Sequence, residues 1–83
     1  MKPIAIITAN LPAAYNYMNE KIKVKDFNKS HRKFTDINDQ IYLIFTDEYQ
    51  MRGFEFSDIW IVPGASDNPN YIEMYDYAKL RVK

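Results

Sequence analysis

The sequence MRGFEFSDIWIVPG, residues 51–64, decides the fold that we expect for this chain. It places an Arg-Gly turn and alternating aromatic and acidic residues directly before an apolar run, residues 59–62, that ends in Pro-Gly. Such a run is typical of a buried strand, and the glycine before it indicates the end of a helix. Ligands of open α/β sheets bind where strands end and loops begin, so a functional site is expected in this neighbourhood.

Two further apolar runs, residues 4–7 and 41–45, predict two more buried strands. The segment between them begins with a helix, because Asn10 can cap it and Pro12 fits its first turn. This helix is expected to end near Lys21. Residues 24–40 are polar and irregular, and can hold a short strand or turn around residues 32–35.

The second half of the chain predicts two helices. Thr46 or Asp47 can cap a short one that stops at Gly53, which suits the position after a helix end. Asn68, followed by Pro69 as the first helical residue, predicts the last helix. Strands and helices therefore alternate in the order βαβαβα.

Right-handed connections between these elements give a three-layer α/β domain with helices on both faces of its sheet. The sheet is expected to have three mainly parallel strands, as in a truncated RecA-like or Rossmann-like fold. The 83 residues make one domain, residues 1–83, because they cannot enclose a second hydrophobic core. So small a sheet should leave an edge exposed, and pairing of such edges could join two copies into a homodimer or bind a partner.

Composition narrows the setting in which the protein works. The absence of cysteine excludes disulfides and thiolate metal sites and favours a reducing compartment. No apolar run approaches the roughly 20 residues of a membrane span, and the first residues do not resemble a signal peptide. We therefore expect a cytoplasmic protein, in the cytoplasm of the host cell if it is viral. Abundant Lys, Asn, Ile and Tyr with only two glycines suggest the AT-rich coding that bacteriophages often have.

Positive charge gathers in one segment although the net charge is zero. Residues 21–35 carry six cations against one carboxylate, whereas residues 36–76 carry nine carboxylates against one arginine. Within the basic segment, Lys29, Arg32 and Lys33 are candidates to contact the phosphates of DNA or RNA. The alternative is that the segment is a solvated, lysine-rich loop.

Two segments resemble the C-terminal RecA-like domain of UvrD/Rep-type helicases. Residues 4–18 read IAIITANLPAAYNYM, where the family has a strand and helix of the form IAILxRxNxxAxxLExxL. Thr46 and the later RGFEFSDI, residues 52–59, follow a strand in the order of the family's TxHxxKGLEFDxV. The spacing from Thr46 to Gly53 is one residue longer than in the family, and Glu48 stands where its histidine is expected.

The resemblance implies roles for four residues. Arg52 would meet a phosphate or order the loop, Gly53 would let a nucleotide approach the backbone, and Glu55 would accept from a ribose hydroxyl. Thr46 would lie near a nucleic-acid backbone. Without the resemblance, Gly53 is a helix stop, Arg52 a surface cation and Glu55 a solvated residue at a strand edge.

Catalysis is not expected from this sequence. It contains no GxxxxGK[ST] motif and no acidic pair at the end of a strand, so the groups that bind ATP phosphates and Mg²⁺ are missing. His31 is the only histidine and makes a poor metal or acid–base candidate. Loop and cap roles explain the carboxylates around the second strand (Asp36, Asp39, Asp47 and Glu48) more simply than a Mg²⁺ site does. We expect no cofactor and no metal.

Tyrosine is abundant, and its positions predict that part of it is exposed. Positions 15 and 17, or 75 and 77, cannot share one helical face. Exposed tyrosines are enriched in protein interfaces and can also stack on bases. The candidates for an interface are Tyr17, Tyr49 and Tyr77.

Three hypotheses for function follow. The first is a small non-enzymatic, phage-encoded protein that binds a bacterial host or phage protein of nucleic-acid metabolism. The second is direct binding of nucleic acid through residues 21–33 and Arg52, and the third is a nucleotide-binding remnant centred on Gly53 and Glu55.

Overall fold

Residues 2–83 form five strands, two α-helices and two single turns of 3₁₀-helix. The computed structural model describes residues 2–83, with the elements β1 (Ile4–Ile7), α1 (Leu11–Lys21), β2 (Val24–Asn28), β3 (Lys33–Asp36), β4 (Ile41–Phe45), η1 (Glu48–Met51), β5 (Asp58–Ile61), η2 (Ala65–Asp67) and α2 (Tyr71–Leu80). None of the helices in this part of the chain is long and apolar enough to cross a membrane.

All five strands belong to one mixed sheet in the order β2-β3-β4-β1-β5. The central β1 is parallel to both β4 and β5, with Ile4 opposite Tyr42 on one side and Asp58 on the other. β3 is antiparallel to both of its neighbours, β2 and β4. The predicted three-stranded, mainly parallel sheet is therefore wrong, although the three strands it contained occur at the expected places.

The error lies in residues 24–40, which form a hairpin and extend the sheet beyond β4. Phe34 and Asp36 are the only residues of β2 and β3 that are buried, and the rest are exposed or half-buried. A strand pair with one polar face and few core residues produces no continuous apolar run, so its sequence reads as a loop.

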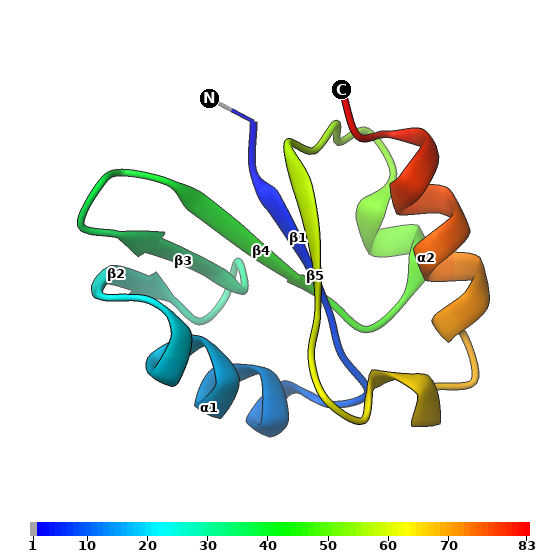
Figure 1. The fold of residues 1–83 in the computed structure, drawn as a ribbon, viewed down its shortest axis with the longest axis horizontal. Helices are drawn as coiled ribbons and strands as arrows, with labels where there is room; N and C mark the ends of the chain where they lie inside the picture. Colours follow the sequence, from blue (N-terminus) through cyan, green and yellow to red (C-terminus); the bar gives the residue numbers. More distant parts are fainter. Residues whose placement is uncertain (1) are drawn as a thin grey trace.

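The two helices lie on opposite faces of the sheet (Figure 1). Ala14 and Met18 of α1 pack with Ile6, Phe34 and Ile44, among others, in one core. The other core contains Met74 and Ala78 of α2 together with Ala5, Ile7, Phe45, Met51 and Phe56. The helix expected in the middle of the chain is a single 3₁₀ turn, η1, so within residues 2–83 only α1 and α2 are α-helices that cover the sheet.

Local capping confirms one predicted helix start and corrects another. The Asn10 side chain caps α1 by accepting a hydrogen bond from the amide of Ala13. α2 instead begins at Tyr71, after Asn70, whereas Asn68 was predicted to cap it. Asn68 is buried, and its side chain binds the backbone that follows β1 and β4.

Residues near both ends of the described chain meet at the segment that leads into β5. Phe56 is fully buried, and its N–H donates to the Arg81 carbonyl while its own carbonyl accepts from the Lys83 amide. The adjacent Ser57 amide donates to the carbonyl of Pro3. These bonds fix the position from which β5 starts.

Candidate functional site

The carboxyl ends of β1 and β4, where a ligand was expected, are closed by a buried side chain. The Asn68 amide nitrogen donates to the carbonyls of Thr8 and Thr46, at 3.0 and 2.9 Å. Its oxygen accepts from the Asn70 amide at 2.9 Å. Because the main hydrogen-bonding groups of Asn68 are used within the protein, this part of the sheet end is structural.

Thr46 shares this structural role. Its carbonyl is bound by Asn68, its amide donates to Gln50 Oε1 at 2.9 Å, and its hydroxyl accepts from Gln50 Nε2 at 3.3 Å. These bonds hold the connection between β4 and η1. Thr46 therefore has few free groups with which to meet a nucleic-acid backbone.

Arg52, Gly53 and Glu55 do not converge on a common point. Arg52 binds Glu48 at 3.1 Å and lies 4.7 Å over the ring of Tyr49. Glu55 lies within 3.9 Å of Lys2 and 3.8 Å of Lys83, near the chain ends. Gly53 has a φ of +88° and open space where a Cβ would lie. A left-handed backbone explains this glycine without a ligand.

Lys29, Arg32 and Lys33 lie together at the turn between β2 and β3. The Asn28 side chain accepts from Ser30 and from the His31 amide, and the Arg32 amide donates to the Lys29 carbonyl. β3 is antiparallel to β4, so this turn lies at the carboxyl end of β4. The structure therefore brings the predicted basic residues to the end of the sheet at which a site was expected.

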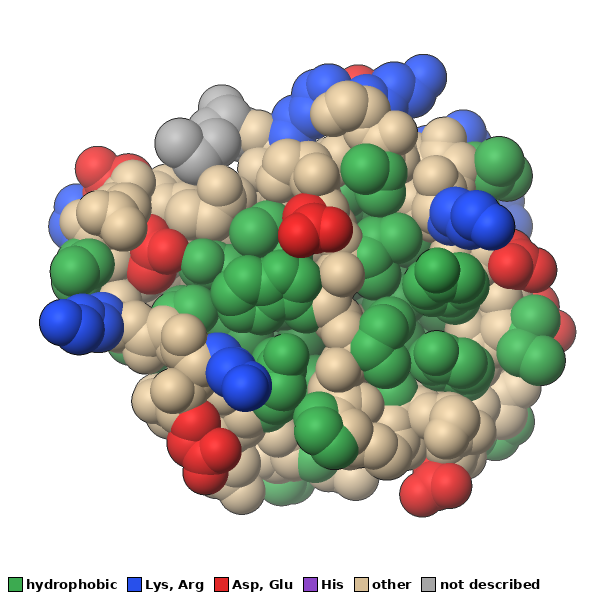
Figure 2. Space-filling model, in the orientation of Figure 1, with side chains coloured by type: hydrophobic (Ala, Val, Ile, Leu, Met, Phe, Trp, Pro, Cys, Tyr) green, Lys and Arg blue, Asp and Glu red, His purple; other side chains and the backbone are tan. Residues whose placement is uncertain are grey.

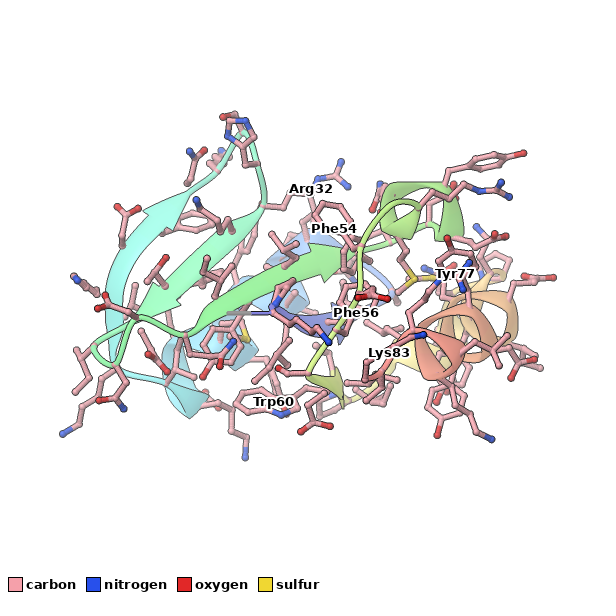
Figure 3. The ribbon with its side chains drawn as sticks, turned by 90° about the horizontal axis from the view of Figure 1, so that it is seen from above. Arg32, Phe54, Phe56, Trp60, Tyr77 and Lys83 are labelled. Atoms are coloured by element: carbon pink, nitrogen blue, oxygen red, sulfur yellow. The ribbon has the colours of Figure 1, made fainter. Side chains whose placement is uncertain are left out.

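A pocket of about 280 Å³ opens beside this turn. It is lined by Ser30, His31, Arg32, Leu43, Ile44, Phe45, Gln50 and Phe54. Figure 3 shows Arg32 reaching from the turn toward Phe54 on the opposite side. Sequence reasoning named Arg32 but missed Gln50 and Phe54 as lining residues, because only the hairpin places the turn beside them.

The three candidate interface tyrosines differ in exposure. Tyr49 is 73% exposed. Tyr17 packs partly against the core beneath α1, and Tyr77 packs partly against the core beneath α2, where Arg81 covers its ring at 4.8 Å. Tyr49 is therefore the most exposed of the three, with Arg52 over one face of its ring.

The outer edge of β5 is free over most of its length. The N–H of Val62 donates to the Ile7 carbonyl, so the backbone groups of Val62 point toward β1. Backbone groups of successive strand residues point to opposite sides, so those of Ile59 and Ile61 point away from β1. The Ile59 amide is bound by the side chain of Asp58 at 2.8 Å. No side chain of the described residues forms a hydrogen bond with the amide of Ile61.

Apolar side chains flank this edge on both faces of the sheet (Figure 2). On the α1 face, the rings of Trp60 and Tyr42 lie 5.1 Å apart. On the α2 face, Ile59 and Tyr71 both pack against the same core, and the ring of Tyr71 stacks on that of Tyr75 at 6.3 Å. Ile61 and Tyr75 are 36% and 37% exposed. The edge thus offers backbone hydrogen-bonding groups between two apolar strips.

The opposite edge, β2, has a different character. Its register shifts between Val24 and Asp26, and the intervening Lys25 forms an ion pair with Asp39. Irregular pairing and exposed charges are the usual means by which proteins prevent strand addition. On β5, Asp58 is the only charged residue that could hinder the addition of a strand.

Asp36 and Tyr42 form a buried polar pair at the base of β3 and β4. The Tyr42 hydroxyl donates to Asp36 Oδ2 at 2.8 Å, and Asp36 Oδ1 accepts from the amides of Asn38 and Gln40. These bonds explain why the chain turns sharply between the two strands. A second hollow of about 240 Å³ beside the pair is lined by both residues and by Trp60.

No group of three or more metal-binding side chains occurs within residues 2–83. Comparisons of the chain with protein-family models, with curated proteins and with solved structures give no match.

Proposed function

We propose that the protein is a non-enzymatic binding domain that pairs an extended segment of a partner protein with the free edge of β5. The observation that carries this proposal is the contrast between the two sheet edges. β2 is charged and irregular, whereas β5 is regular and flanked by apolar side chains. A regular edge on which only Asp58 guards a backbone amide is a template for another strand.

The partner strand would bond to the outward backbone groups of Ile59 and Ile61. Its alternating side chains would contact Trp60 on one face and the strip of Tyr71 and Tyr75 on the other. Aromatic residues of this type are enriched at the centres of protein interfaces. Asp58 must release the Ile59 amide when the partner binds, so a basic residue at the adjoining position of the partner would favour binding.

The composition and the motif order of residues 46–59 support a partner from nucleic-acid metabolism, in a bacterial host or a phage, and a location in the host cytoplasm. The exposed Tyr49 and its neighbour Arg52 lie outside the β5 edge and could extend the contact. The same β5 edge could instead pair with that of a second copy.

The experiment compares capture of partners from a bacterial lysate by the parent chain and by Ile61→Pro. Proline removes the outward N–H of Ile61 but no bond of β5 to β1, and an extended residue before it is compatible with proline. Ile72→Lys is the control, because Ile72 is 70% exposed on α2 and belongs to neither strip. We expect a partner that the parent and the control retain and the proline variant loses.

Sedimentation of the same three chains shows whether the β5 edge binds a partner protein or a second copy of this chain. A dimer of the parent that Ile61→Pro abolishes would assign the edge to a second copy. Retention of every partner by the folded proline variant would overturn the proposal.

A further inference from the structure

The pocket beside the β2–β3 turn is lined by an aromatic ring, an amide and a guanidinium, those of Phe54, Gln50 and Arg32. We propose that it binds one nucleotide unit, with the base against Phe54 and the phosphate at Arg32. This site lies outside the β5 edge and does not depend on the function proposed for that edge.

Phe54 provides a preformed surface for a base. Its ring lies 6.1 Å from that of Phe45 and stacks on Phe56 at 6.4 Å, yet it remains 40% exposed. Aromatic rings that are held from behind in this way stack on bases of any type. The pocket volume of about 280 Å³ is near the lower limit of ordinary ligand sites and suits one base with its sugar.

Gln50 adds a fixed polar group. Both ends of its amide are oriented by Thr46, which donates to Oε1 and accepts from Nε2. One hydrogen of Nε2 remains for a ligand, and it can contact an acceptor on the edge of a base or a sugar hydroxyl.

The charge around the pocket favours an anion. Its lining contains no carboxylate, and Arg32 forms no ion pair with any residue of the described chain. Lys29 and Lys33 adjoin Arg32 in the turn. A guanidinium binds phosphate with two parallel hydrogen bonds, which suits a phosphate at the mouth of the pocket.

The backbone at Arg32 provides an independent argument. Arg32 has a φ of +51°, a left-handed conformation that glycine or asparagine adopts more readily. Its amide and carbonyl are both bound, to Lys29 and Ile44. The chain thus places a long cation where a small residue would fit the backbone better, as is common where side chains bind ligands.

The experiment measures fluorescence anisotropy of a labelled oligothymidylate of about 10 nucleotides, and calorimetry of thymidine and adenosine monophosphates, with four variants. Arg32→Gly removes the cation and relieves the backbone, and Phe54→Leu removes the aromatic face but keeps an apolar side chain. The controls are Lys79→Gln, which removes an exposed cation on α2, and Tyr49→Ala, which removes an exposed aromatic outside the pocket.

We expect Arg32→Gly and Phe54→Leu each to weaken binding about tenfold, and the two controls to leave it within about twofold. Stronger binding of the oligonucleotide than of the monophosphates would identify nucleic acid as the source of the nucleotide, and equal binding would identify a free nucleotide. Absence of binding by the folded parent at millimolar ligand would overturn the proposal. Equal binding by the parent and both pocket variants would also overturn it.

Discussion

The hydroxyl of Tyr42 donates a 2.8 Å hydrogen bond to the carboxylate of Asp36, and both residues are buried. Burial, and then the bond to Asp36, raises the pKa of Tyr42 to about 12. The same bond lowers the pKa of Asp36, helped by the Gln40 and Asn38 amides against the opposing effect of burial. Each partner therefore keeps the other in the protonation state that the bond requires.

This pair makes stability depend on pH at both extremes. Tyr42 has a raised folded pKa, so its contribution is complete below its ordinary value of 10.0 and is lost as the pH rises through about 12. Asp36 has a lowered folded pKa, so its contribution is complete above 3.8 and is lost as the pH falls below that value. Urea unfolding across these two windows should show both losses.

Tyr42→Phe should abolish the alkaline loss that is due to this residue. It should also lower the free energy of unfolding by about 1.5 kcal/mol at neutral pH, because a hydrogen bond to a carboxylate is removed. Ultraviolet titration identifies the group, since the variant should lack the tyrosine that ionises near pH 12. An unchanged titration curve would contradict the assignment.

Asn68 should be more important for stability than its place in a loop suggests. In Asn68→Asp the carboxylate cannot donate to the Thr8 and Thr46 carbonyls, so two buried acceptors lose their partner. We expect a loss of about 2–3 kcal/mol in urea unfolding. Asn70→Asp is the matched control, because Asn70 is exposed at the start of α2 and an acid is favourable there. Equal losses of stability in the two variants would show that the bonds of Asn68 to the Thr8 and Thr46 carbonyls do not stabilise the fold.

Arg32 and Gly53 both have a positive φ, and we expect substitutions at the two positions to change the free energy of unfolding in opposite directions. Gly53→Ala should lower the free energy of unfolding by about 1 kcal/mol through its positive φ alone, since nothing lies where the Cβ would be. Arg32→Gly should raise it by about 0.5 kcal/mol, because relief of the left-handed backbone exceeds the added entropy of glycine. Thermal unfolding of both variants beside the parent tests the signs, and a destabilised Arg32→Gly would refute the second.

Asp58 should control the availability of the β5 edge. Asp58→Ala frees the Ile59 amide and removes a charge from the edge, so self-association should increase. Sedimentation over a range of protein concentrations measures this effect. The double variant Asp58→Ala/Ile61→Pro should return to the state of the parent, whereas persistent association would place the contact elsewhere.

The parts of the fold that the sequence predicts are those with strong local signals. Ile4, Ile44 and Ile59 belong to apolar runs that fix three strands, and Asn10 marks a helix start through its capping side chain. β2 and β3 lack such runs because most of their own residues are polar and only Phe34 enters the deep core. Without them, the edge at which the sheet ends could not be assigned.

The candidate site shows the same limit. Arg32 was recognised from its charge, but Phe54 and Gln50 become its neighbours only through the pairing of β3 with β4. Asn68 was predicted as a helix cap because local sequence cannot reveal its bond to Thr8, 60 residues away in the chain. The resemblance to a helicase motif placed Arg52 and Glu55 together, whereas their ion pairs point to different parts of the surface.

Some strands of the sheet pair with strands next to them in the sequence, and others pair with strands far away in the sequence. This difference should set the order in which the strands pair during folding. β2, β3 and β4 pair with their sequence neighbours, so they can associate early. β1 must pair with β4 and β5, which lie far from it in the sequence, and this pairing carries a larger entropic barrier. We therefore expect the edge of β5 to form after the hairpin has paired with β4, so the proposed binding strand should be completed late in folding.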